Sequence, residues 1–131
     1  MDFKVVPEQM ALVNVDVQNC FVAGSPISAA DGLAVLDRIN RLSAVCRDAG
    51  ILVIHTLFVL RPDGSNIGVL AETSPPAKEG ILNRGTESAA LHPRLVVGPK
   101  EENVNSYLTN PLFPKTSAIS PNSNPSSLAL V

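Results

Sequence analysis

The feature that most constrains the fold is an apolar run that ends on a single carboxylate. Residues 11–15 read Ala-Leu-Val-Asn-Val, and Asp16 follows them directly. A short run with this β-branched content predicts a strand of a parallel sheet that is buried on both faces. In open parallel sheets, ligands bind beyond the carboxyl ends of the strands. Asp16 is therefore the first candidate for a functional residue.

A helix and a second apolar run follow this strand. Apolar residues recur with a helical period across residues 30–48, at Val35, Ile39, Leu42 and Cys46. Ser28 and Asp31 have the spacing of a capping arrangement before this helix, and Gly50 fits the left-handed position that ends it. Residues 51–58 form the second apolar run, so we expect a right-handed β-α-β unit with parallel strands. The predicted fold class is α/β.

The remainder of the chain has a different character. Residues 61–86 contain many Gly and Pro residues, which predicts a loop with at most a short helical turn. Residues 110–131 are rich in Pro, Ser and Asn and show no helical or strand period, which predicts an irregular tail. We therefore expect a domain portion at residues 1–108 and a tail at residues 109–131.

Length and charge limit the classes of function. The chain has 131 residues, of which 10 are basic and 12 acidic, for a formal net charge of -2. A single core is usual at this length, and no Lys/Arg cluster provides the positive surface that nucleic acids need. No apolar stretch approaches the roughly 20 residues that cross a bilayer, and the N-terminus lacks a secretory pattern. We therefore expect a cytoplasmic protein with neither a nucleic-acid nor a membrane partner.

Neither the cysteines nor the histidines form a metal-binding pattern. Cys20 and Cys46 lack a C-x-x-C partner, so we expect free thiols, with Cys46 buried in the helix as a small hydrophobic residue. His55 and His92 have no carboxylate or second His at ligand spacing. We expect His55 to be a hydrogen-bonded core residue, and we expect neither a metal nor a cofactor.

Several ordered stretches match the pattern of one enzyme family. Residues 15–21, Val-Asp-Val-Gln-Asn-Cys-Phe, resemble a D-x-Q-N-D-F signature, with Cys20 in place of its second Asp. Residues 39–56 resemble a helix, Gly-Ile turn and second strand, and residues 84–93 resemble a G-T-x-x-A-E-L-H-P stretch. In these features the chain resembles the isochorismatase-like hydrolases, also called the cysteine hydrolase superfamily. The resemblance implies a three-layer, Rossmann-like parallel-sheet fold, present here as about its first three strands.

The resemblance also implies a chemistry. In the family, a thiol attacks the carbon of a small amide, ureido or vinyl-ether substrate, an Asp takes up the thiol proton, and a Lys assists the charge separation. Asp16 matches the signature's Asp, and Gln18 and Phe21 are the substrate-binding candidates beside it. The lysine of the family pattern T-K-P-x-x-S-A-F has three placements here, and we take Lys115 over Lys100 or an alignment that leaves Asn110 in that position.

The thiol of that chemistry has no counterpart in its expected place. The family's nucleophile lies in a later G-x-x-T-x-x-C-V segment, whereas no Cys follows Cys46 in this sequence. Cys20 is close to Asp16 but is expected on a loop, without the helix N-terminus that favours a thiolate. We therefore expect Cys20 to be a substituted residue packed against Phe21.

Three interpretations of function follow. The first is a truncated and inactive member of the hydrolase family. The second is a non-catalytic chain that pairs with a full-length homologue through the uncovered edge of the strand at residues 11–15. The third is a frameshifted gene product without function. The same uncharged edge also predicts a homo-oligomer or an aggregation-prone chain.

Overall fold

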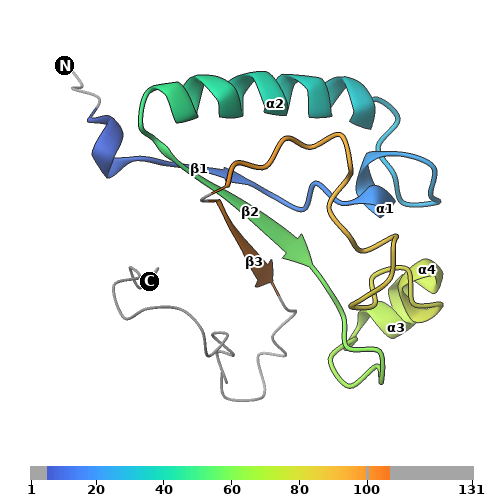
Figure 1. The fold of residues 1–131 in the computed structure, drawn as a ribbon. Coiled ribbons are helices and arrows are strands. Elements are labelled where there is room, and N and C mark those ends of the chain that lie inside the picture. Colours follow the sequence, from blue (N-terminus) through green and yellow to red (C-terminus); the bar gives the residue numbers. More distant parts are fainter. Residues whose placement is uncertain (1–5, 100, 107–131) are drawn as a thin grey trace, which may run out of the picture.

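A parallel three-stranded sheet in the order β1-β2-β3 organises the molecule. The computed structural model describes residues 6–99 and 101–106. The strands are β1 (Ala11–Asn14), β2 (Leu52–Phe58) and β3 (Glu102–Ser106), and α2 (Gly32–Asp48) lies along one face of the sheet (Figure 1). The parallel β-α-β unit predicted from the sequence is confirmed.

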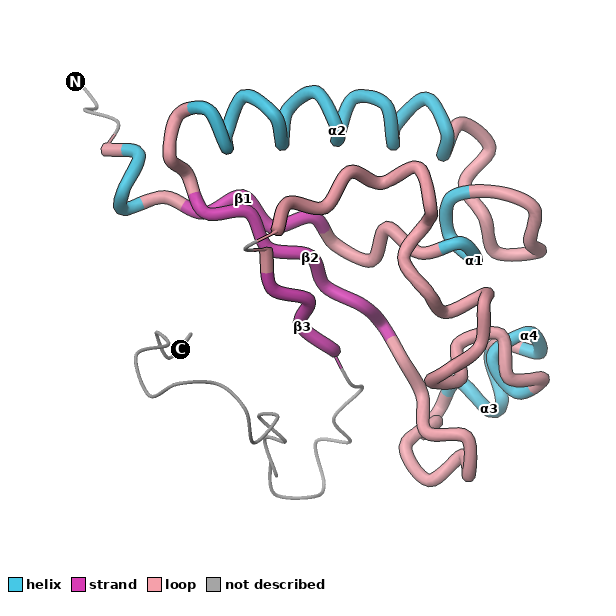
Figure 2. The backbone as a smooth tube through the Cα atoms, in the orientation of Figure 1, coloured by secondary structure: helices cyan, strands magenta, loops and turns pink. Residues whose placement is uncertain are grey.

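Four short elements complete the described chain. They are η1 (Pro7–Gln9), α1 (Asn19–Val22), α3 (Leu70–Thr73) and α4 (Pro75–Lys78). Figure 2 shows that loops make up most of the chain between β2 and β3. The segment expected to hold at most one helical turn therefore holds two, because Ser74 caps α4 by accepting the Ala77 N–H and a Pro begins that helix. None of the described helices is both long and apolar enough to span a membrane.

The start of α2 differs from the prediction. Ser28 does not cap the helix, because its hydroxyl donates to Ser25 O at 2.8 Å within the preceding turn. The N-cap residue is Asp31, whose side chain makes no capping bond. The end of α2 agrees with the prediction, since Gly50 follows it with a φ of 77°.

The sheet is covered on one face only within the described residues. Asn14 of β1 and Val53 of β2 lie under α2 and are 6% and 2% exposed. On the other face, Val13 is 45% and Leu52 is 53% exposed. The prediction that the first strand is buried on both faces is therefore wrong for this part of the chain, which supplies a helix to a single face. The described residues form two of the three expected layers.

The core consists of two clusters that meet at α1. The first lies beneath α2 and contains Val17, Val22, Leu36 and Leu95. The second lies between α1 and the loops after β2 and contains Cys20, Leu60, Ala77 and Leu82. Each fully buried large aliphatic side chain contributes about 1.5–3 kcal/mol. Because α1 contributes Val22 to the first cluster and Cys20 to the second, packing on both sides holds α1 in place beyond the end of β1.

Candidate active site

Asp16 lies just beyond the carboxyl end of β1 in a left-handed backbone conformation. Its φ is 55°, the only positive value at a non-glycine residue in the described chain. The Asp16 N–H donates to Thr56 O at 3.2 Å and lies at the same distance from Thr56 Oγ1. The Thr56 hydroxyl donates in turn to Asp16 Oδ1 at 2.7 Å. Thr56 therefore fixes both the backbone and the carboxylate of Asp16.

Gln18 is wholly buried, and its amide holds the neighbouring segments together. Its Nε2 donates to Phe58 O at 3.0 Å and to Ala89 O at 2.6 Å, while its Oε1 accepts the Phe58 N–H at 2.7 Å. These bonds use both amide hydrogens, so Gln18 has no donor left for a ligand in this structure. Its role in binding substrate stays a prediction.

Phe21 and Asn19 occupy the short helix α1. Phe21 is half-buried and packs against the second core cluster. Asn19 Nδ2 donates to Glu87 O at 2.7 Å, and the backbone N–H groups of Asn19 and Cys20 donate to Ala90 O and Ser88 O, each at 2.9 Å. The first amides of α1 are therefore bonded to protein carbonyls and do not face an open site.

Cys20 is a core residue and not a poised nucleophile. It is 1% exposed among Leu60, Ala77 and Leu82. Burial raises the pKa of its thiol to about 11, and the charge of Asp16 acts in the same direction. The thiol is therefore protonated at neutral pH and unreactive. The expectation of a packed residue is confirmed, although Cys20 lies in a helical turn and not on a loop.

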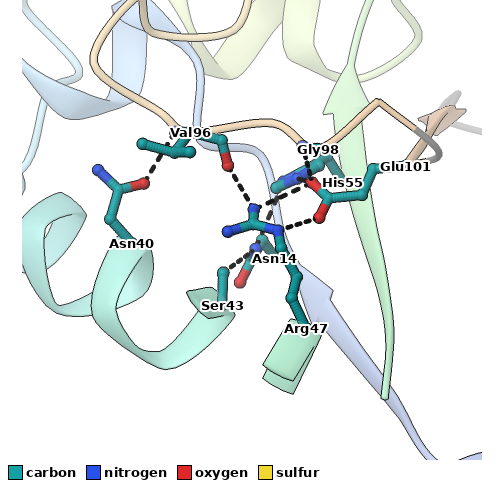
Figure 3. Close-up of polar contacts among 8 residues, drawn as sticks. All are labelled: Asn14, Asn40, Ser43, Arg47, His55, Val96, Gly98 and Glu101. Carbon is teal, nitrogen blue, oxygen red and sulfur yellow. Dashed lines mark hydrogen bonds and ion pairs between the residues drawn. The ribbon is translucent and has the colours of Figure 1, made fainter. Parts of the chain in front are cut away.

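Apart from the residues around Asp16, a polar cluster lies between α2 and the sheet (Figure 3). Glu101 accepts hydrogen bonds from the Arg47 guanidinium, from Gly98 N at 2.7 Å and from His55 Nε2 at 2.8 Å. Arg47 pairs with this carboxylate most strongly and lowers the pKa of Glu101 to about 2. The Arg47 guanidinium also donates to Val96 O at 2.5 Å, so the cluster joins α2, β2 and the segment before β3.

His55 is held in one tautomer by this cluster. Asn14 Nδ2 donates to Ser43 Oγ at 3.0 Å and lies 3.4 Å from His55 Nδ1. An amide donor facing Nδ1 makes this nitrogen the acceptor, which leaves the Nε2–H to donate to Glu101. The prediction of a hydrogen-bonded core histidine is confirmed, and its carboxylate partner lies far away in the sequence. No group of three potential metal-ligating side chains occurs among the described residues.

Two hollows of the described surface are lined by residues other than Asp16. One, of about 440 Å³, lies at the start of α2 between Val22 and Ala34. The other, of about 250 Å³, is lined by residues that include Asn19, Cys20 and Glu87. Lys100, Asn110 and Lys115 lie outside the described residues. The structure thus brings Asp16, Gln18 and Phe21 to one end of the sheet, and the carboxylate lines neither of these two hollows.

Comparison with known proteins identifies the family. The sequence model of the family described as "Isochorismatase domain" matches residues 10–117. The chain belongs to the isochorismatase family. Comparison with the curated proteins gives no match.

Solved structures of isochorismatase-family proteins share this fold. A cysteine hydrolase from Pseudomonas syringae pv. phaseolicola has a TM-score of 0.72 at 22% identity, with 80% of this chain and 49% of that chain covered, which shows the fold alone. A family protein from Desulfovibrio vulgaris has a TM-score of 0.59 at 27% identity, with 72% and 50% covered. One from Burkholderia thailandensis has a TM-score of 0.62 at 27% identity, with 79% and 52% covered. The chain spans about half the length of these structures.

The sequence of this isochorismatase-family chain did not lead us to Thr56 or to the cluster around Glu101. Thr56 carries a usable signal, because it is a hydroxyl residue in the C-terminal half of β2, and parallel strands bring their carboxyl ends to one edge of the sheet. The Glu101 cluster carries none, because Glu101 lies 54 residues from Arg47 and 46 residues from His55 and meets them only through packing.

Proposed function

We propose that this chain carries the acid–base half of a cysteine hydrolase site that acts on a small amide, ureido or vinyl-ether substrate. The observation that carries the proposal is the Asp16 carboxylate, which is fixed by Thr56 beyond the end of β1. Parallel sheets bind their ligands at this end. A carboxylate held there by its neighbours, at the cost of a left-handed backbone, is typical of a functional residue.

In this proposal each predicted residue has one task. Asp16 accepts the proton of the attacking thiol, which makes the thiolate that attacks the substrate carbon. Lys115 supplies the positive charge that stabilises this separation. Phe21 contributes an apolar wall beside the substrate. Gln18 lines the substrate site, and its three bonds join the segment after β1 to Phe58 at the end of β2 and to the loop at Ala89.

We further propose that the 131-residue chain is inactive by itself. Its two cysteines, Cys20 and Cys46, are both buried, and no other thiol occurs in the sequence. Neither can reach the carbon of a substrate bound beside Asp16 without a rearrangement of the core.

We also propose a cytoplasmic setting for this chain, because a thiol-dependent enzyme needs the reducing conditions found there.

The test combines a substrate panel with a chimera. The purified chain, Asp16→Asn and Cys20→Ala are incubated with nicotinamide, ureido and isochorismate-type substrates, and we expect no turnover above buffer from any of them. Turnover by the native chain that both substitutions abolish would show that the chain is active and that Cys20 is its nucleophile.

The chimera tests the role of Asp16 directly. Residues 1–106 replace the corresponding part of the Burkholderia thailandensis relative, and circular dichroism confirms folding. We expect hydrolysis of one panel substrate by the chimera and at least about a hundredfold loss on Asp16→Asn, since a general base contributes about 10²–10⁴-fold. A folded, active chimera that tolerates Asp16→Asn would contradict the proposal.

The alternative function is that of a non-catalytic partner for a full-length homologue. The observation that favours it is the outer edge of β1, which has no strand partner in the described part of the chain. This function needs no thiol. Co-purification of the tagged chain with a homologue at equal stoichiometry would support it, and activity of the homologue that is unchanged by the chain would contradict a modulating role.

A further inference from the structure

The hydrogen-bond ladder between β1 and β2 changes character where Asp16 leaves the sheet. The Asp16 N–H still donates to Thr56 O, as the parallel register requires. In a continued ladder, the next two bonds would run from Phe58 N–H to Asp16 O and from Gln18 N–H to Phe58 O. Instead, the Gln18 N–H donates to Asp16 O at 2.7 Å. The β1 backbone therefore bonds to itself here and leaves the N–H and C=O groups of Phe58 to another partner.

The side-chain amide of Gln18 bonds to both of these groups of Phe58. Its Oε1 accepts the Phe58 N–H at 2.7 Å, and its Nε2 donates to Phe58 O at 3.0 Å. A side-chain amide offers the same donor and acceptor as a peptide group. A third bond, from Nε2 to Ala89 O at 2.6 Å, uses the other amide hydrogen. The Gln18 side chain therefore replaces the backbone of β1 in the last step of the ladder.

The replacement also decides on which face of the sheet the Asp16 carboxylate lies. Side chains alternate along a strand, so an extended Asp16 would lie with Asn14 on the face beneath α2 (Figure 3). Thr56 lies on the opposite face, because its neighbour His55 is buried beneath α2. Asp16 accepts the Thr56 hydroxyl, at 2.7 Å, in a left-handed conformation with a φ of 55°. The left-handed turn therefore places the carboxylate at Thr56 and away from the helix face.

We propose that Gln18 is a positioning residue that holds Asp16 in this left-handed turn. Without Gln18, the turn would leave two backbone groups of Phe58 unbonded, and a left-handed conformation is already disfavoured for a residue with a Cβ. The Gln18 amide removes the first of these costs, so it stabilises the turn relative to a continued strand. This role does not require Gln18 to touch the substrate. The turn itself depends on backbone bonding alone, whereas its part in catalysis rests on the function proposed above for Asp16.

A double-mutant cycle at positions 16 and 18 tests the turn in the 131-residue chain. Asp16→Gly and Asp16→Ala both remove the carboxylate, but only Gly adopts a left-handed backbone without steric cost. With Gln18 in place, we expect urea unfolding to give a folding equilibrium constant about two- to tenfold higher for Asp16→Gly than for Asp16→Ala. Combined with Gln18→Met, the preference should reverse, because the backbone can then continue the ladder and an extended strand favours Ala over Gly. The same preference for Gly in both backgrounds would overturn the role of Gln18.

Asn40→Leu is the matched control for the loss of an amide that bonds to the backbone. The Asn40 amide also bonds to two backbone groups, Arg94 O at 2.8 Å and Val96 N at 2.9 Å, but it lies on α2 and makes no bond to the turn at Asp16. We expect this substitution to lower stability and to leave the preference for Gly at position 16 unchanged. If Gln18→Met does not fold, Gln18→Asn takes its place in the cycle, because its amide is one methylene too short to reach Phe58.

The chimera described above tests the consequence for catalysis. We expect Gln18→Met to lower kcat about ten- to a hundredfold with little change in KM, because a displaced base loses rate and not substrate binding. In a chimera that carries Asp16→Asn, the same substitution should cause no further loss. An equal loss in both chimeras would show that Gln18 acts independently of Asp16 and would overturn the positioning role. Tolerance of Asp16→Asn itself would contradict the proposed function alone, because the cycle at positions 16 and 18 needs no activity.

Discussion

Asp16 shows how one residue obtains its position from a neighbour that is remote in the sequence. A non-glycine residue with a φ of 55° is disfavoured by about 1 kcal/mol or more, so other contacts must offset that cost. The bonds to Thr56 do so, because they satisfy the Asp16 N–H and orient its carboxylate. The sequence identifies the carboxylate, and the parallel register of β1 and β2 supplies the residue that holds it.

We expect Thr56→Val to lower the free energy of unfolding by about 1–2 kcal/mol, because the substitution removes the hydroxyl that donates to Asp16 Oδ1. Amide hydrogen exchange at Asp16 should become faster at the same time. Thr56→Ser keeps the hydroxyl and should restore slow exchange. Thr73→Val is the control, since the Thr73 hydroxyl bonds only within the exposed helix α3. Equal effects at the two threonines would contradict the role assigned to Thr56.

Cys20 should resist alkylation in the folded chain. Its pKa of about 11 leaves little thiolate at neutral pH, and its side chain is buried. In a Cys46→Ala background, we expect iodoacetamide to react slowly at pH 7 and faster only as the pH approaches the raised pKa. Addition of denaturant should give rapid, stoichiometric labelling. Rapid labelling of the folded variant at pH 7, followed by mass spectrometry, would show that the thiol is accessible.

At the scale of the element, the helical period predicts where α2 lies in the sequence, whereas packing decides which of its residues face inward. The period places a helix at residues 30–48, and the structure has one at Gly32–Asp48. The period also groups Leu42 with the inward-facing residues, whereas Leu42 is exposed and Ser43 is fully buried. Ser43 turns inward because Asn14 on β1 bonds to it. A buried polar pair therefore sets the rotation of the helix.

Substitutions along α2 should reflect this rotation. Leu36 is fully buried in the first core cluster, so Leu36→Ala should lower the free energy of unfolding by about 2–5 kcal/mol. Leu42→Ala is the matched control on the same helix and should cost less than about 1 kcal/mol, because Leu42 is 53% exposed. Urea unfolding measures both. A loss for Leu42→Ala as large as that for Leu36→Ala would contradict this rotation of the helix.

At the scale of the whole molecule, Glu101 joins parts that come from three regions of the sequence. Its carboxylate contacts Arg47 of α2 and His55 of β2 at the point where the chain enters β3. A charged group at so buried a position is stable only because every partner is in place. Assembly of the third strand therefore depends on this cluster.

The pH dependence of stability should report this cluster. The pKa of Glu101 is lowered from 4.5 to about 2, so the charge contributes stability above pH 4.5 that is lost as the pH falls towards 2. Glu101→Gln should cost about 3 kcal/mol at neutral pH, and the difference from the native chain should vanish near pH 2. Glu79→Gln, at an exposed glutamate, is the control and should change little at any pH. A constant difference down to pH 2 would contradict the assigned ion pair.

The sequence by itself determined the local features of this protein: the α/β class, the strand–helix–strand order, the Gly50 stop and the position of Asp16 at the end of β1. These follow from the apolar pattern, from backbone preferences and from a motif of adjacent residues, all of which are local. Tertiary structure alone decided that Thr56 holds Asp16, that Ser43 faces inward and that Arg47, His55 and Glu101 form one cluster. Such contacts join residues that are distant in the chain, and only the register of the sheet and the rotation of α2 bring them within bonding distance.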